Sequence, residues 1–345
     1  MIVTGTAQHE AWQRRELPPV EEVRTDVWSI PVPIPHNPLR YTLSYAFVDD
    51  SGVLLIDPGW DTPDGRAAVT AGLRAAGVGV GDVAGVLVTH VHPDHHGLSG
   101  WVREQSGAWI GMHPLEARTL PGRVWRDRRP ETDHAWLVRH GVPEEHAAAL
   151  VVNRERLGGL LDLAEPDRLI EDGDLLALAR HQVRAVWTPG HTPGHLCLHE
   201  VDAGILLTGD HLLPRISPNI GVHAGSDGDP LSAYLMSLEQ MGKYGHEEAL
   251  PAHEYRFRGV DARAVELVRH HDERGAEILR MVDSLGAPTA WTVAAGLTWS
   301  RGWDALHGMT RRMALAETLA HLNHLAATGV VRAGGDAPMH WHRSG

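Results

Sequence analysis

Four histidines and one aspartate stand within seven consecutive residues, His90-Val91-His92-Pro93-Asp94-His95-His96. They follow Val83–Thr89, an almost wholly apolar run of the kind that forms a strand buried on both faces. Side chains alternate along an extended chain, so His90 and His92 are expected on one side, with Asp94 and His95 at the following helix start. Imidazole and carboxylate groups suit zinc, and also iron or manganese. The segment therefore predicts a metal site.

Further donor residues follow other apolar runs in the same way. His191 stands in Thr188-Pro189-Gly190-His191-Thr192-Pro193-Gly194-His195, after the run Val183–Trp187. Asp210 follows the run Gly204–Thr208, and His253 follows a short apolar stretch at Leu250. Loops at strand ends converge on sites that a rigid scaffold positions. We therefore expect these three residues to join the first cluster.

Predicted strands and helices, which must position these residues, alternate along the chain. Turn signals and apolar runs predict strands at 27–32, 41–48, 53–56, 83–89, 109–112, 183–187, 195–201 and 204–208. Helical spacing predicts helices at 64–77, 95–106 and 229–243. Residues 114–166 have a helical pattern broken at Gly141-Val142-Pro143, which indicates a helical insertion beside the site.

The last part of the chain has a different pattern. Helices are expected at 261–285, 289–297 and 313–327, followed by a two-stranded ribbon at 330–332 and 339–342. We therefore predict an N-terminal arm at 1–22, expected to be loose, a catalytic domain at 23–260, and a small C-terminal domain at 261–345.

Composition excludes several classes of protein. Acidic residues outnumber basic residues by 44 to 31, giving a formal charge of −13, so nucleic acid is not an expected partner. No segment approaches the ~20 apolar residues that span a bilayer, and residues 1–20 lack the layout of a signal peptide. The single cysteine, Cys197, excludes an internal disulfide framework and fits a cytoplasmic location. The 25 histidines alone decide nothing, because base-composition bias also raises such counts.

On these residues the chain resembles the metallo-β-lactamase-fold hydrolase superfamily over about residues 23–258. Asp57, in Ile56-Asp57-Pro58-Gly59, is similar to the first motif of that family, and His90-to-His95 to the second. His191, Asp210 and His253 match the third, fourth and fifth motifs. The stretch around His191 is similar to the glyoxalase II-like branch. Residues 261–345 resemble the winged-helix-like domain of the β-lactamase-like protein 2 group.

The resemblance implies an α/β fold, an αββα sandwich with a helical insertion and a winged-helix-like C-terminal domain. It also implies a site for two Zn²⁺ ions, with iron or manganese as alternatives. One ion would be held by His90, His92 and His191. The other would be held by Asp94, His95 and His253, with Asp210 bridging. A metal-bound hydroxide would be the nucleophile, and Asp94 and His211 are the expected catalytic side chains.

The implied reaction is hydrolysis of a thioester, with a small-molecule or carrier-linked acyl substrate such as an acyl-CoA, an acyl-carrier or a glyoxalase II-like substrate. A thiolate departs without protonation more readily than an amine. The alternatives are a β-lactam or lactone hydrolase, a metal-dependent RNA endonuclease, an iron-dependent persulfide oxygenase and a non-enzymatic metal-binding protein. A homodimer is also considered.

Most other histidines near the motifs are expected to have supporting or structural roles. His96 and His195 are expected to make supporting hydrogen bonds rather than to bind metal. His211 is expected either to touch substrate or to support the site. A structural role is expected for His113, and Cys197 is expected to be a buried core residue.

Overall fold

The computed structural model describes residues 1–124, 129–152, 155, 158–226 and 228–344. Contacts divide the chain into two compact units. The first unit comprises 1–124, 159–218 and 237–264, and the second comprises 125–158, 219–236 and 265–345. The sequence is thus interleaved between the units, and two of the boundaries fall within helices, α10 (Pro230–Gln240) and α11 (Val260–Leu285).

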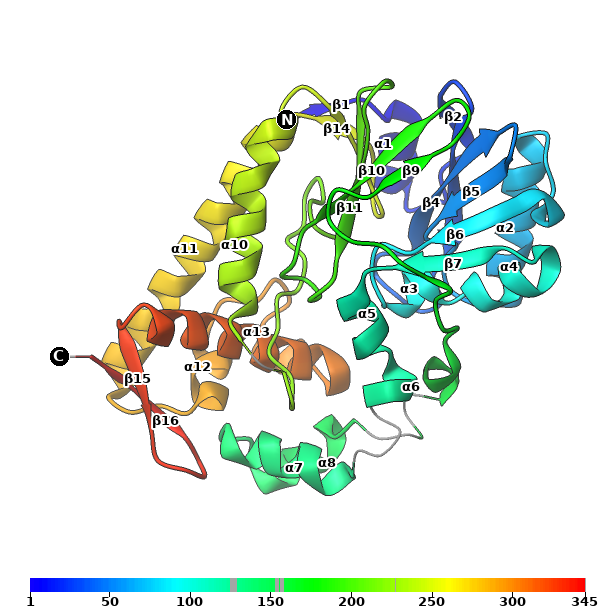
Figure 1. Cartoon of the computed structure of the whole chain (residues 1–345). Coiled ribbons are helices and arrows are strands. Elements are labelled where there is room, and N and C mark those ends of the chain that lie inside the picture. The colour runs from blue at the N-terminus through cyan, green and yellow to red at the C-terminus, as the bar shows by residue number, and fades with distance from the viewer. Residues whose placement is uncertain (125–128, 153–154, 156–157, 227, 345) are drawn as a thin grey trace. The chain divides into compact units, whose positions relative to one another are not determined.

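Two mixed β-sheets form the centre of the first unit (Figure 1). One sheet has the order β2-β3-β4-β5-β6-β7-β8, with parallel pairing from β5 to β8 and antiparallel pairing elsewhere. Its strands are β2 (Glu21–Arg24), β3 (Val27–Pro33), β4 (Tyr41–Asp49), β5 (Gly52–Ile56), β6 (Val83–Leu87), β7 (Trp109–Met112) and β8 (Arg168–Leu169).

The second sheet has the order β1-β14-β13-β12-β11-β10-β9 and is antiparallel except between β12 and β13. Its strands are β1 (Ile2–Val3), β9 (Leu175–Ala177), β10 (Gln182–Trp187), β11 (Leu196–Glu200), β12 (Ile205–Gly209), β13 (Glu248–Pro251) and β14 (Phe257–Arg258). The sheets and helices confirm the predicted α/β class.

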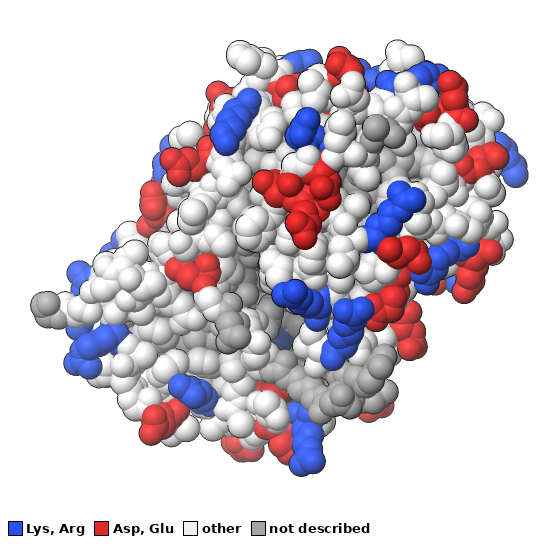
Figure 2. Space-filling model, in the orientation of Figure 1, with Lys and Arg blue, Asp and Glu red and all other residues white. Residues whose placement is uncertain are grey.

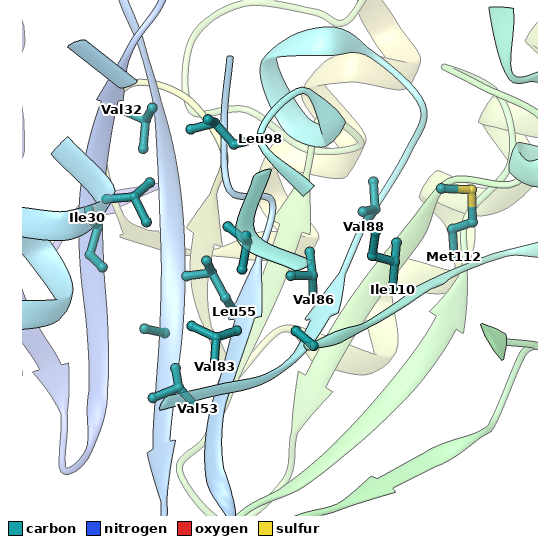
Figure 3. Packing of buried hydrophobic residues seen from close by; sticks show 14 of the residues in the cluster. Ile30, Val32, Val53, Leu55, Val83, Val86, Val88, Leu98, Ile110 and Met112 are labelled. Carbon is teal, nitrogen blue, oxygen red and sulfur yellow. The ribbon is translucent and has the colours of Figure 1, made fainter. Parts of the chain in front are cut away.

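One apolar core lies between the first sheet and its helices, α2 (Pro63–Ala75) and α4 (Ser99–Ser106). Parallel strands need crossover connections, and these two helices supply them between β5 and β6 and between β6 and β7. Figure 3 shows side chains from β3, β5, β6 and β7 packed together with Leu98, which precedes α4. Burial of this face holds the carboxyl end of β6 in place.

A second core joins the two sheets face to face. Tyr45, Phe47 and Leu54 of the first sheet share it with Leu198 and Leu207 of the second. All residues of β12 and all but Ala84 of β6 are buried, as their largely apolar sequences predict.

The helix expected at 95–106 is broken into α3 (Pro93–His96) and α4. Gly59 enters the break: its N–H donates to the His95 carbonyl, and its own carbonyl accepts from the N–H of Leu98. An added side chain at Gly97 would lie 2.8 Å from the Asp61 backbone nitrogen and 2.9 Å from the Gly59 carbonyl, so glycine permits this close approach. The break ties α3 to the loop that follows β5.

The prediction of a loose N-terminal arm is wrong for Ile2–Arg14. β1 pairs with β14, and α1 (Thr6–Arg14) buries Gln8 and Ala11. The Gln8 side chain donates to the Ser29 hydroxyl and accepts from the N–H of Arg256. The polar sequence did not predict this packing, because the partners of Gln8 lie more than 20 and more than 240 residues away in the chain.

The second unit is mainly helical. It contains α7 (Pro130–Arg139), α8 (Glu144–Leu150), α12 (Ala290–Gly296), α13 (Gly308–Ala327) and an antiparallel ribbon of β15 (Val331–Gly334) and β16 (His340–Arg343). The C-terminal helices and ribbon lie close to their predicted positions. Helices α7 and α8, which the sequence assigned to an insertion in the first domain, belong here instead. Two shorter helices of that insertion, α5 (Pro114–Thr119) and α6 (Pro121–Val124), belong to the first unit.

Among the described residues, none of the helices combines the length and apolar character that crossing a bilayer requires.

Candidate metal centre

The predicted metal ligands all follow the carboxyl ends of strands in the first unit. His90, His92, Asp94 and His95 follow β6 of the first sheet. His191, Asp210 and His253 follow β10, β12 and β13 of the second sheet, respectively. Because the two sheets pack face to face, these strand ends bring the seven residues together.

Three histidines form one potential metal-binding group. The Nδ1 atom of His92 lies 3.0 Å from His90 Nε2 and 3.1 Å from His191 Nε2. His90 is buried, whereas His92 and His191 are residues of intermediate exposure. Three imidazole nitrogens directed at one point are a suitable set for a divalent transition metal.

A second group contains Asp94, His95 and His253. Asp94 Oδ2 lies 3.8 Å from His95 Nε2 and 3.5 Å from His253 Nε2. His95 and His253 are fully buried, whereas Asp94 keeps partial exposure. A carboxylate with two imidazoles is again a common donor set for zinc, iron or manganese.

Asp210 lies between the two groups. Its Oδ1 atom is 3.6 Å from His95 Nε2 and 3.2 Å from His253 Nε2. Its Oδ2 atom is 3.6 Å from His191 Nε2. Each carboxylate oxygen thus faces a different histidine group, as a bridging ligand requires.

Buried polar atoms provide a test of whether a metal fits this site. His95 Nε2, Asp210 Oδ1 and His253 Nε2 are buried and have no hydrogen-bond partner among the residues that the structure describes. Leaving such atoms unsatisfied costs about 1–3 kcal/mol each. All three belong to the donor groups described above. The residues present therefore fit a bound metal.

Burial sets the protonation of the three-histidine group. Burial lowers the pKa of His90 well below its ordinary value and lowers that of His92 to about 3, with repulsion from His191 adding to the effect on His92. A neutral imidazole keeps a lone pair for a metal. In the other group burial acts in the same direction, but Asp210 and Asp94 outweigh it and raise the pKa of His95.

Asp57 contacts His95 directly and reaches His90 through Thr89, so it connects the two histidine groups. Its carboxylate accepts from the N–H and the hydroxyl of Thr89, both at 2.7 Å, and lies 2.8 Å from His95 Nδ1. The Thr89 hydroxyl in turn lies 3.1 Å from His90 Nδ1. These contacts fix the orientation of the rings whose Nε2 atoms face the site. Asp57 has φ of 49°, a left-handed conformation that is unusual for a residue with a side chain.

Two further residues position the candidate ligands that follow strands of the second sheet. His253 Nδ1 lies 2.8 Å from the Tyr41 carbonyl, which directs its Nε2 toward Asp210. His195 Nε2 accepts from the N–H of Asp210 at 3.1 Å, and its Nδ1 lies 2.8 Å from the Thr188 hydroxyl. His195 thus makes the supporting hydrogen bonds predicted for it.

The other histidines considered from the sequence lie around the centre. His96 makes hydrogen-bond contacts with the Ser99 hydroxyl and the Ala164 carbonyl, both at 2.8 Å. His113 accepts from the N–H of Leu115 and stacks on Trp187. His211 is fully buried, 6.1 Å from the His195 ring. Its predicted catalytic role stays a prediction.

Glu116, a fully buried residue in the first turn of α5, is not among the residues expected from the sequence. Its carboxylate accepts from the N–H of Val91 at 2.8 Å and from the N–H of Gly194 at 2.6 Å. The local signal is weak: an acidic residue two positions after Pro114 and four positions after the end of β7. Its partners lie 25 and 78 residues away in the chain, so no local pattern identifies them.

Comparisons with known proteins agree with this geometry. A sequence profile described as the metallo-beta-lactamase superfamily matches residues 37–253. The protein described as probable metallo-hydrolase YqjP of Bacillus subtilis is 25% identical over 321 residues, which cover 88% of this chain and 92% of the relative. The atrochrysone carboxyl ACP thioesterase dmxR1 of Cryptosporiopsis is 23% identical over 333 residues, covering 92% and 86%.

A solved structure is similar over nearly the whole chain. It is described as a metallo-beta-lactamase family protein from Thermus thermophilus. The sequences are 33% identical, the TM-score is 0.77, and the match covers 93% of this chain and 100% of the other. The similarity therefore includes the C-terminal region as well as the metal centre.

Proposed function

This chain belongs to the metallo-β-lactamase superfamily and is a hydrolase, and we propose that it hydrolyses thioesters with two bound metal ions. The observation that carries the two-metal proposal is the position of Asp210, whose two oxygens face different donor groups. His90, His92 and His191 would hold one ion, and Asp94, His95 and His253 the other. We propose zinc as the metal, since these donors suit it.

Bound metal ions would lower the pKa of a coordinated water and polarise the substrate carbonyl. The protein's own residues supply position and proton transfer. Asp57 and the Tyr41 carbonyl hold the rings of His95 and His253, and His195 holds the backbone N–H of Asp210. Asp94 is the partly exposed carboxylate of the centre. It would orient the hydroxide or, for a leaving group that needs it, carry a proton. His211 is fully buried beside the His195 ring and would support the site by packing there.

The thioester is favoured by chemistry and by one relative. A thiolate leaves without protonation, so no separate acid at the sulfur is required. The protein that is 23% identical over 92% of this chain is described as an ACP thioesterase. A small-molecule or carrier-linked acyl group is therefore the proposed substrate.

Nucleic acid and membranes are not proposed as partners. The formal charge is −13, and on the face in Figure 2 basic residues are interspersed with acidic ones. Binding to phosphates needs concentrated Lys and Arg. A cytoplasmic location and a homodimer stay predictions, which fractionation of cells and light scattering would check.

The test combines metal analysis with a substrate panel on the purified protein. The panel contains an acyl-CoA, an acyl-carrier thioester, a glutathione thioester, a lactone, a β-lactam and an RNA. We expect two metal ions per chain and hydrolysis of at least one thioester, lost on chelation and restored by Zn²⁺. Fewer than about one ion per chain in metal-replete buffer would contradict the two-metal site. Metal-dependent cleavage of the β-lactam, lactone or RNA without thioester hydrolysis would overturn the substrate class.

A further inference from the structure

Glu116 joins the two loops that carry the three-histidine group. One carboxylate oxygen accepts from the N–H of Val91, which stands between His90 and His92. The other accepts from the N–H of Gly194, three residues after His191. The first loop follows the first sheet and the second loop follows the second sheet. A single side chain therefore connects the segments that supply all three histidines.

We propose that Glu116 is a positioning residue that sets the metal affinity of the His90–His92–His191 group by fixing the separation of these two loops. The proposal rests on the proposed metal role of the three histidines. His92 Nδ1 must stay close to nitrogens on both loops, from His90 and from His191. A change in loop separation alters that geometry directly.

Burial makes the connection specific for a carboxylate. Glu116 is 0% exposed, so its carboxylate is withdrawn from water. Both of its oxygens instead accept from backbone N–H groups, at 2.8 and 2.6 Å. Glutamine has one acceptor oxygen, so its amide group would turn N–H toward one of the two donors. A buried donor left facing another donor is strongly unfavourable.

Gly194 provides independent support for a close approach at this point. A Cβ atom at Gly194 would lie 2.7 Å from the Glu116 backbone nitrogen and 2.8 Å from His113 Nδ1. Real Cβ atoms essentially never approach so closely. The second glycine of the Thr-Pro-Gly-His-Thr-Pro-Gly-His stretch is therefore required by the packing of this loop on α5, next to the carboxylate.

Glu200 offers a matched control in the same unit. It is also a fully buried glutamate whose oxygens accept from two backbone N–H groups, those of Gln182 and Ala203. It stands at the end of β11 opposite to the end that joins the His191 loop. Its Oε1 atom also lies 3.8 Å from His181 Nδ1, and neither this contact nor the two N–H groups belong to the metal-binding loops. Glu200→Gln therefore alters a buried carboxylate that accepts from two N–H groups without touching either loop.

The experiment measures Zn²⁺ affinity by competition with a chelator, in a His253→Ala background that leaves the three-histidine group intact. We expect Glu116→Gln to weaken the affinity about 10- to 100-fold, the usual effect of losing a contact that orients ligands. Glu200→Gln should keep the affinity of the background. The rise in melting temperature on adding Zn²⁺ should likewise shrink for Glu116→Gln only. If Glu116→Gln does not fold, Glu116→Asp, one methylene too short to reach both donors, replaces it.

The possible outcomes separate the two proposals. Unchanged Zn²⁺ affinity in the folded Glu116 variant would overturn the positioning role, as would an equal loss in Glu200→Gln. An absence of Zn²⁺ binding in the unsubstituted protein would instead overturn the proposed metal function itself.

Discussion

At the scale of single residues, Asp210 has the most demanding position. It is buried, its backbone N–H is held by His195, and its two oxygens face different histidines. Although burial opposes ionisation, His253 and His95 lower the pKa of its carboxyl well below the ordinary value. A charged carboxylate between two donor groups is the feature that distinguishes a two-metal site from a one-metal site.

The substitution Asp210→Asn tests this position. We expect hydrolysis to fall by more than about 100-fold, because even contacts one step removed from a metal commonly contribute 10- to 100-fold. The metal content should also fall below that of the unsubstituted protein. Activity assays and metal analysis on the same samples provide the measurement. Asp202→Asn, an exposed aspartate in the turn before β12, is the control and should change neither quantity. Full activity in the Asp210 variant would disprove the bridging role.

At the scale of elements, a buried ion pair connects two helices of the second unit. Arg312 of α13 makes a bidentate contact with Asp133 of α7, at 2.7 and 2.8 Å, and also donates to the Leu150 carbonyl. Both charged side chains are almost completely buried. The pair fixes α7, from the middle of the sequence, against a helix near its end.

Removing one partner of this pair leaves an uncompensated buried charge. We therefore expect Arg312→Met to reduce the free energy of unfolding by about 3–5 kcal/mol. The double variant Arg312→Met with Asp133→Leu should recover part of that loss, since no isolated charge remains. Urea unfolding of the two variants measures the difference. Arg269→Ala, in an exposed ion pair on α11, should have little effect. A double variant less stable than the single one would contradict this account.

At the scale of the whole molecule, the interleaved chain builds a second unit with its own buried titratable groups. His271 Nδ1 lies 3.2 Å from His321 Nε2, joining α11 to α13. Burial, together with repulsion between the two rings, lowers the pKa of His271 to about 3. Burial lowers the pKa of His321 to about 4. Arg274 also disfavours protonation of both rings.

These shifts predict a loss of stability in acid. In the unfolded chain both histidines titrate near their ordinary pKa of 6.5, so below that pH the unfolded state binds more protons. The contribution to stability is therefore complete above pH 6.5 and declines as the pH falls toward about 4. Urea unfolding at pH 7, 6 and 5 measures the decline.

The variant His321→Gln should show a smaller decline than the unsubstituted protein, because glutamine does not titrate. His246→Gln, an exposed histidine, should follow the unsubstituted protein at each pH. Equal slopes for all three proteins would show that the buried pair does not contribute.

The amino-acid sequence by itself determined the donor residues and most of the strands and helices. Apolar runs marked β6, β10 and β12, and the residues that follow them are the ones whose atoms converge. Only the tertiary structure decided how the donors are held: Glu116 reaches two loops, Asp57 reaches His95, and Gln8 anchors a segment expected to be loose. It also decided that α7 belongs with α13. The physical reason lies in the range of each signal. Periodicity indicates which face of a helix or strand is buried. These contacts join residues far apart in the chain, and the local sequence does not predict such partners.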